Sequence, residues 1–140
     1  MGKIKVIEGE IFTDYRGKIF SLNNFYFGGV KRCYFLYHPD TNIFRGWNAH
    51  KNERKWFYCI KGSFQLECVE IDNWENPSDE LILEIFIMTD NKSELVAVPK
   101  GYGTCLKANE PDSIMMVLSD KTLDETVGDN YKYESSKWHG

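Results

Sequence analysis

His50 is the residue of this chain best suited to act as a base, because it lies inside a strand-like motif. A neutral imidazole has an unperturbed pKa of about 6.5, so much of it is free base at neutral pH. A well-placed base of this strength can remove a proton from a carbon beside a ketone. The other two histidines are less favourably placed, His38 in a turn beside Pro39 and His139 next to the end of the chain. We expect His50 to be a general base; the alternative is a structural histidine hydrogen-bonded within the fold.

Cations and phenols supply the other candidate site residues. Arginine forks suit bidentate binding of a phosphate group, and the candidates are Arg16 and Arg45. An enediolate formed from a ketone needs a proton donor or a cation, and a phenol can be that donor. Each candidate has a structural alternative, an exposed charge for the cations and a core side chain for the tyrosines. The further candidates are Lys31, Arg32 and Lys51 for the ligand, and Tyr37 and Tyr102 for the proton. The run 51–55 predicts an exposed turn of mixed charge.

Strands are the elements that would position these residues. Apolar and polar residues alternate with a period of two, most clearly at 64–69 and 81–88. Clusters of Gly, Pro, Asn and Asp separate such stretches, and only 119–126 predicts a helical turn. Many short strands with turns between them predict an all-β sandwich or barrel. Further strands are expected at 3–8, 18–24, 31–37, 56–60, 94–98, 104–107 and 113–119.

Length and charge limit the class of protein. The 140 residues include 17 Lys plus Arg and 21 Asp plus Glu, so the formal net charge is −4. This length predicts one domain over 1–140, with a polar and aromatic C-terminal tail from about residue 128. The acidic balance argues against non-specific nucleic-acid binding. We find neither the run of about 18 apolar residues that a membrane helix needs nor a signal peptide. We expect a cytoplasmic protein whose partners include no nucleic acid and no membrane.

The four cysteines stand singly in apolar stretches, and no two have C-x-x-C spacing. This pattern favours buried, reduced thiols that pack as small apolar groups. The alternatives are zinc binding and a nucleophilic thiol. The residues are Cys33, Cys59, Cys68 and Cys105.

Three segments together resemble a known family. They are Asp14-Tyr15-Arg16-Gly17, the pair of segments 31–37 and 45–51, and Met115-Met116-Val117-Leu118-Ser119. Their order and spacing resemble the dTDP-sugar 3,4-ketoisomerases and, more distantly, the dTDP-4-dehydrorhamnose 3,5-epimerases. The resemblance implies a cupin jelly roll, a homodimer and a 4-keto-6-deoxy nucleotide sugar as ligand.

The central motif departs from the family pattern. The ketoisomerases have Arg-Gly-x-His-Ala-His-Lys, whereas here the first histidine is Asn48 and the second is His50. An amide cannot take a proton from carbon, so we expect Asn48 to donate a hydrogen bond to a sugar hydroxyl or to the enediolate. The metal-ligand positions of cupins correspond to Asn48, His50, Lys55 and Thr104. With one imidazole in that set and a lysine at the carboxylate position, we expect no metal and no cofactor.

These observations support one leading hypothesis. The protein would be an isomerase that moves the ketone of a dTDP-linked sugar from C4 to C3 by proton abstraction, in surface polysaccharide biosynthesis. The alternatives are a non-catalytic cupin that binds a sugar or nucleotide sugar, and a structural or regulatory cupin. The aromatic tail, with Tyr131, Tyr133 and Trp138, is expected to lie across the fold or a partner subunit. The need to cover sheet edges also favours a homodimer.

Overall fold

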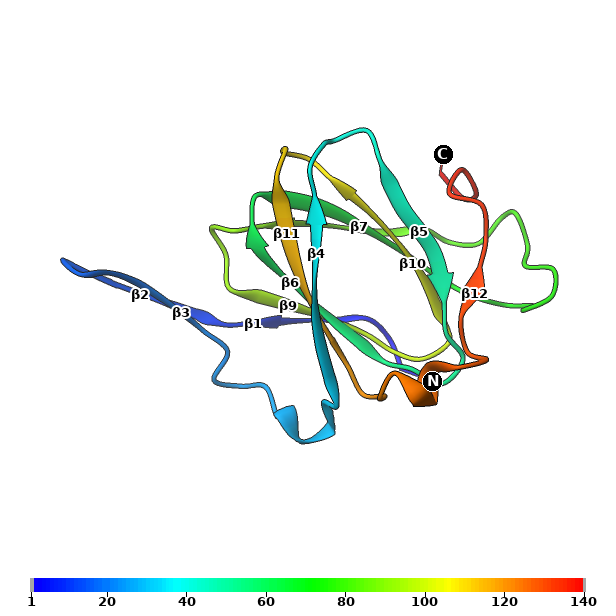
Figure 1. Cartoon of the computed structure of the whole chain (residues 1–140), viewed down its shortest axis with the longest axis horizontal. Helices are drawn as coiled ribbons and strands as arrows, with labels where there is room; N and C mark the ends of the chain where they lie inside the picture. The colour runs from blue at the N-terminus through cyan, green and yellow to red at the C-terminus, as the bar shows by residue number, and fades with distance from the viewer. Residues whose placement is uncertain (1, 140) are drawn as a thin grey trace.

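Two antiparallel five-stranded sheets form the body of the protein, and a separate two-stranded hairpin projects from it (Figure 1). The computed structural model describes residues 2–139. The order is β1-β9-β6-β11-β4 in the first sheet and β12-β5-β10-β7-β8 in the second. Neighbours in the sheets are therefore mostly distant in sequence, which is the connectivity of a jelly roll. The prediction of an all-β cupin jelly roll is confirmed.

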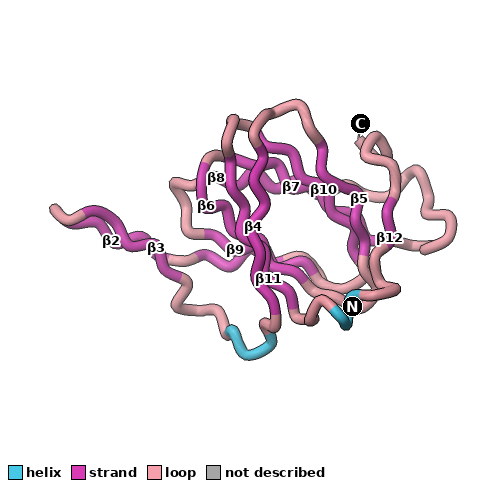
Figure 2. The backbone as a smooth tube through the Cα atoms, viewed as in Figure 1, coloured by secondary structure: helices cyan, strands magenta, loops and turns pink. Residues whose placement is uncertain are grey.

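The elements are short, and strands dominate them (Figure 2). The first sheet contains β1 (Lys5–Glu8), β9 (Glu94–Val98), β6 (Lys55–Lys61), β11 (Ser113–Ser119) and β4 (Arg32–His38). The second contains β12 (Tyr131–Lys132), β5 (Phe44–Ala49), β10 (Tyr102–Ala108), β7 (Ser63–Glu70) and β8 (Glu84–Thr89). The hairpin consists of β2 (Glu10–Asp14) and β3 (Gly17–Ser21). Within residues 2–139 the helical elements are two 3-10 turns, η1 (Phe27–Gly29) and η2 (Asp124–Thr126).

Most of the predicted strands are present close to their predicted bounds. The strand predicted at 81–88 begins only at Glu84, because Leu81 and Leu83 pack against the outer face of the second sheet. The helical turn predicted at 119–126 is confined to η2. Strands β2, β5 and β12 were not predicted.

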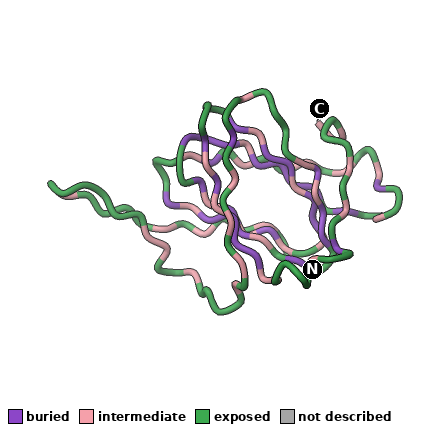
Figure 3. Tube along the Cα trace, viewed as in Figure 1, coloured by how far each residue is buried: buried purple, intermediate pink, exposed green. Residues whose placement is uncertain are grey.

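The alternation seen in the sequence of β7 separates two apolar clusters. Phe64 and Leu66 are fully buried in the cluster between the sheets, whereas Val69 belongs to a second cluster on the outer face. Figure 3 shows the buried residues gathered in the facing strands and the β2–β3 hairpin largely exposed. Burying one large apolar side chain contributes roughly 1.5–3 kcal/mol. The interior cluster therefore holds the two sheets together.

The C-terminal tail lies across the outer face of the second sheet. The indole of Trp47 is fully buried there, and its Nε1 donates a hydrogen bond to the Lys137 carbonyl at 2.7 Å. Trp138 packs edge-on against Trp47, with ring centroids 5.0 Å apart, and its own Nε1 donates to the Ser78 carbonyl. Of the two positions expected for the tail, this chain adopts the one across its own fold.

A β-bulge sets which residues of β5 face the interior. In the pairing with β10, Asn48 is opposite Thr104 and Arg45 is opposite Leu106, so two residues of β5 face one of β10. The extra residue lets Arg45 and Asn48 share a face although they are three apart. Gly46 lies in the bulge with φ of +146°, and a Cβ there would come within 2.6 Å of the Thr104 carbonyl oxygen. Only glycine fits this position.

The cysteines follow the prediction with one exception. Cys59, Cys68 and Cys105 are buried, and all four thiols of the described chain are free. The prediction is wrong for Cys33, which is exposed because it faces outward on β4. In the part of the chain that the structure describes, no helix has the length and apolar character required to cross a membrane.

Candidate functional site

Two adjoining pockets of about 250 and 190 Å³ lie between the sheets and share Tyr34, Asn48 and Lys55. Together they are of the size at which proteins hold small molecules. Their lining comes from both sheets and from the tail. The larger pocket is also lined by Arg32, His50, Glu53, Leu123, Thr126, Asn130 and Lys132, and the smaller by Leu36, Arg45, Phe57, Thr104 and Leu106.

The imidazole of His50 is fixed at one nitrogen and free at the other. Its Nδ1 lies 2.7 Å from the carbonyl oxygen of Asp129. Because a carbonyl only accepts hydrogen bonds, Nδ1 carries the proton and Nε2 holds a lone pair. Nε2 is buried and has no hydrogen-bond partner in the described chain, and His50 lines the larger pocket. The wall of the larger pocket therefore includes a histidine whose Nε2 is left unpaired by the described chain.

Burial lowers the pKa of His50 below its ordinary value of 6.5, and the nearby Lys55 ammonium lowers it further. The Asp129 carbonyl and the Glu53 carboxylate act in the opposite direction but do not outweigh these causes. His50 is therefore neutral at pH 7, as a base must be.

A buried carboxylate supports this histidine. Oε1 of Glu53 lies 3.4 Å from His50 Nδ1, and the Glu53 side chain is almost completely buried. Oε2 accepts hydrogen bonds from Arg32 at 2.9 Å and from the Ser119 hydroxyl at 2.5 Å. A carboxylate held in this way stabilises the imidazolium that forms when Nε2 takes up a proton. The prediction of an exposed turn at 51–55 is wrong for Glu53.

The tail contributes the group that orients His50. Besides its carbonyl, Asp129 uses its carboxylate, which accepts hydrogen bonds from the backbone N–H groups of Lys51 at 2.7 Å and Asn52 at 3.0 Å. One tail residue thus fixes both the imidazole and the loop that follows β5. Asp129 is itself buried.

The structure brings four of the predicted site residues to the pockets. His50 and Asn48 line the larger one, together with Arg32, and Asn48 and Arg45 line the smaller one. The Arg45 Nε donates a hydrogen bond to His38 Nε2 at 3.1 Å, which fixes the guanidinium on the pocket wall. Arg32 is engaged by Glu53, so its contribution is first to position that carboxylate.

Five predicted site residues do not line these pockets. Tyr37 is 67% exposed on the outer side of β4, and Tyr102 is buried in the interior apolar cluster, where burial raises the pKa of its phenol. Lys31 pairs with Glu125, and the Lys51 ammonium lies over the rings of Trp74 and Tyr131. Arg16 is at the tip of the projecting hairpin, paired with Asp14 at 2.6 Å.

Sequence reasoning missed Tyr34, Glu53 and Asp129 as parts of the site, and it considered Lys55 only as the residue at a metal-ligand position. The signal for Tyr34 is the alternation of β4, in which Arg32, Tyr34 and Leu36 share the inner face. No comparable signal exists for Asp129, which is 79 residues from His50 in sequence.

The four positions that correspond to cupin metal ligands do meet in these pockets. Asn48 and Lys55 line both pockets, His50 the larger and Thr104 the smaller. Transition metals in such sites require several imidazole or carboxylate donors. An amide, an ammonium and a hydroxyl beside one imidazole do not fit a metal ion.

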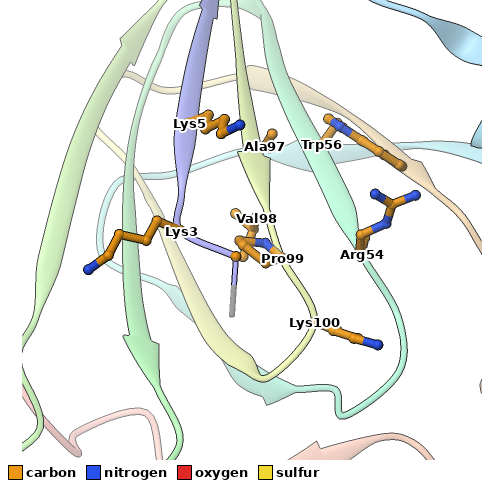
Figure 4. A pocket seen from close by; sticks show the side chains of 9 residues that line it. Lys3, Lys5, Arg54, Trp56, Ala97, Val98, Pro99 and Lys100 are labelled. Atoms are coloured by element: carbon orange, nitrogen blue, oxygen red, sulfur yellow. The ribbon is translucent and has the colours of Figure 1, made fainter.

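A further pocket of about 270 Å³ lies on the outer side of the first sheet (Figure 4). Lys3, Lys5, Arg54 and Trp56 are among its lining residues. The guanidinium of Arg54 stacks over the Trp56 ring and pairs with Asp120 at 3.0 Å. The described chain has no buried polar atom without a partner in this pocket. It therefore lacks the free, fixed functional group that distinguishes the pockets around His50.

The fold and the polar interior pocket define a jelly roll of the cupin class. Comparison with family models finds a match over residues 2–138 to the family described as FdtA: WxcM-like, C-terminal. The chain belongs to this family. Comparison with curated proteins finds no match.

Three solved structures illustrate the similarity in fold. The WlaRB TDP-quinovose 3,4-ketoisomerase from Campylobacter jejuni is 19% identical, with a TM-score of 0.73 and 95% of each chain covered. A mutant of the 3,4-ketoisomerase QdtA from Thermoanaerobacterium thermosaccharolyticum, in complex with TDP-4-keto-6-deoxyglucose, is 20% identical, with a TM-score of 0.70 and 91% of this chain and 85% of that chain covered. A dTDP-4-dehydrorhamnose 3,5-epimerase from Bacillus anthracis str. Ames is 18% identical, with a TM-score of 0.71 and coverage of 86% and 75%.

Proposed function

We propose that this protein catalyses 3,4-ketoisomerisation of a TDP-linked 4-keto-6-deoxy sugar. The observation that carries the proposal is the unpaired Nε2 of His50, a neutral base buried at the pocket wall with its other nitrogen hydrogen-bonded to Asp129. Membership of the FdtA: WxcM-like family and the similar folds of ketoisomerases and an epimerase support the choice of substrate class. A cytoplasmic role in surface polysaccharide biosynthesis accords with this chemistry.

The reaction begins with proton transfer to His50. Nε2 takes the hydrogen of sugar C3 as a proton, the C3–H electron pair forms a C3–C4 double bond, and the carbonyl electrons move to O4. Returning a proton to C4 while the O3 hydroxyl loses its own gives a ketone at C3 and a hydroxyl at C4. The C3 hydrogen has then been replaced by one at C4 and the O3 proton by one at O4, so the atoms balance without a co-reactant.

Pocket residues stabilise the charge that develops on O4. The Lys55 ammonium is the cation that both pockets share with Asn48, whose amide can donate a hydrogen bond. Preorganised donors of this kind act most strongly where water is excluded. Tyr34 also lines both pockets and supplies a phenol that can pass a proton between O3 and O4. We assign to these three residues the role predicted for Tyr37 and Tyr102, which lie elsewhere.

The diphosphate of the substrate requires cations, and one of the two predicted arginines, Arg16, lies far from the pockets of its own chain. Arg45 lines the smaller pocket, whereas Arg16 lies at the tip of the hairpin. That hairpin exposes Phe12 at 56% and Ile19 at 59%, a large apolar surface for a free hairpin. We propose a homodimer in which each hairpin packs against the other copy and brings its Arg16 to the partner site.

Solvent exchange tests the enzymatic proposal directly. The full chain is incubated in D₂O with TDP-4-keto-6-deoxyglucose, and the sugar is analysed by NMR. Deuterium at C4 of a 3-keto product, or at C3 of recovered substrate, is the expected result. A protein that binds the sugar nucleotide without any exchange would instead be a binding module, which is the alternative that Asn48 suggested from sequence.

Subunit complementation tests the shared site. Arg16→Ala is expected to reduce nucleotide affinity at least about tenfold, since charge-assisted hydrogen bonds contribute about 1.5–3 kcal/mol. Lys18→Ala, in the same hairpin, is the matched control. Mixing Arg16→Ala with His50→Asn protein should restore activity, because a mixed dimer contains one intact site. A mass near 16.4 kDa by light scattering at every concentration would contradict the dimer.

A further inference from the structure

A second cluster of reactive groups lies outside the pockets, beneath the C-terminal tail. Glu67 of β7 and Cys105 of β10 are directly opposite each other in the antiparallel pairing, and both are buried. His139 of the tail completes the group. A carboxylate oxygen, the thiol sulfur and an imidazole nitrogen of these three residues all lie within 4.8 Å of one another.

The polar atoms of this cluster lie close together, but two of them form no hydrogen bond within the described chain. Oε1 of Glu67 is 2.7 Å from His139 Nδ1, yet within residues 2–139 neither Oε1 nor His139 Nε2 takes part in a hydrogen bond. The Glu67 side chain is only 5% exposed. Its other oxygen accepts a hydrogen bond from Gln65 at 2.9 Å, so Oε1 alone is left over. Buried polar atoms are rarely unpartnered, and a bound ion that satisfies them is one of the usual reasons.

We propose that Glu67, Cys105 and His139 bind a zinc ion that fastens the tail to the second sheet. Thiolate, imidazole and carboxylate are the ligands that zinc takes in proteins, whereas magnesium and calcium require sets of oxygen ligands. Three residues leave one tetrahedral position for water, and the His139 side chain, 21% exposed, lies where solvent can reach. The sequence led us to expect no metal in this chain, with His139 set aside because it is next to the end of the chain. The proposed site departs from that expectation and lies on the opposite face of β10 from His50.

The free thiol must lose its proton for zinc to bind. Burial and the nearby Glu67 carboxylate raise the pKa of the Cys105 thiol to about 12, so without metal the thiol is protonated. A divalent ion at the site reverses this effect, because it stabilises the thiolate that it binds. The same ion neutralises the buried Glu67 carboxylate, which among the described residues has one hydrogen bond, from Gln65, and the His139 ring beside it.

Zinc at this position would act on the stability of the tail. The aromatic residues of the tail already cover the second sheet, with Trp138 packed against Trp47 and hydrogen-bonded to Ser78. A zinc ion bound by His139, by Glu67 of β7 and by Cys105 of β10 would attach the C-terminal end of the tail to the sheet. The inference concerns the outer face of the sheet and does not depend on the proposed isomerase activity.

Cobalt substitution provides the test. The full chain is stripped of metal and titrated with Co²⁺, whose bond to a thiolate gives a charge-transfer absorption in the near ultraviolet. We expect one equivalent of Co²⁺ to produce this band and Zn²⁺ to displace it. Zn²⁺ should also raise the melting temperature of the stripped protein.

Three variants identify the ligands. Cys105→Ser should abolish the band. His139→Asn should weaken Co²⁺ binding at least about tenfold, because even the loss of a residue that only hydrogen-bonds a metal ligand usually costs about that much affinity. Because His139 lies in the tail, its substitution leaves the core intact and stays informative if Cys105→Ser fails to fold. Cys33→Ser removes an exposed thiol and is the matched control, with an unchanged titration. Absence of the band in the wild-type chain, or its persistence in His139→Asn at wild-type affinity, would overturn the proposal.

Discussion

The inner and outer faces of the β5–β10 pair are built from alternate residues of the same two strands, yet they differ in almost every property. The inner face presents Arg45, Asn48 and Thr104 to an open, polar pocket. The outer face presents Trp47 and Cys105 to an apolar cluster covered by the tail. A β-strand alternates its side chains between faces, so one short segment can serve both surfaces.

The two faces are connected, because the C-terminal tail that covers the outer face also contributes a residue to the site on the inner face. The tail first passes the site, where the Asp129 carbonyl fixes His50, and then covers the outer face through Trp138. A preorganised base needs such a supporting residue, because an imidazole that rotates freely has no fixed tautomer or direction. Variants on the inner side should therefore affect the reaction, and variants of the tail should affect both reaction and stability.

The largest expected effect is that of removing the base. His50→Asn should lower turnover by about 10²–10⁴-fold, the usual contribution of one acid–base group, while nucleotide binding stays nearly unchanged. Turnover and deuterium incorporation measure the loss. Asn48→His restores the histidine pair and is expected to keep the exchange activity or divert it towards epimerisation. Undiminished exchange in His50→Asn would show that another residue is the base.

Lys55→Met is expected to lower turnover by about 10²-fold, because the removal of one preorganised donor beside a developing oxyanion usually has an effect of that size. Since the ammonium lowers the pKa of His50, its removal should also shift the acid limb of the activity profile towards higher pH. Lys61→Met, on the same strand but exposed, is the matched control. An acid limb that stays in place would mean that Lys55 does not act on the base.

Asp129→Ala tests the connection between the two faces. The change removes the carboxylate that accepts two backbone hydrogen bonds, and leaving those N–H groups unpaired costs about 1–3 kcal/mol. We expect a fall of that size in the free energy of unfolding, measured by urea denaturation, together with a lower turnover because the His50 loop is loosened. If stability falls and turnover does not, the tail supports only the fold.

The smallest effect is a dependence of stability on pH. Burial lowers the pKa of both His50 and His38 below 6.5, assisted by Lys55 in one case and Arg45 in the other. As pH falls below about 6.5 the unfolded chain binds protons at these residues before the folded chain does, so the free energy of unfolding decreases. Urea denaturation between pH 5 and 8 should show it, with a shallower slope in His50→Asn. An equal slope would mean that the pKa of His50 is not lowered.

Much of the fold was predictable because its signals are local. The period-two pattern at 64–69 places Phe64 and Leu66 on one face of a strand whatever the strand packs against. Strand β5 was missed, since its bulge and Gly46 interrupt the alternation that would have revealed it. The same bulge lets Arg45 and Asn48 face one pocket, which simple alternation would not predict.

The sequence by itself determined most of the strands, the family resemblance and His50 as the base to be tested, because residue type and short-range spacing carry that information. Tertiary structure alone decided what surrounds that base. Asp129 meets His50 across 79 residues of chain, and a turn predicted to be exposed buries Glu53 beside it. The meeting of Glu67, Cys105 and His139 was decided in the same way, by strand pairing and by the return of the tail. Such contacts arise from packing between distant segments, and no local pattern records them.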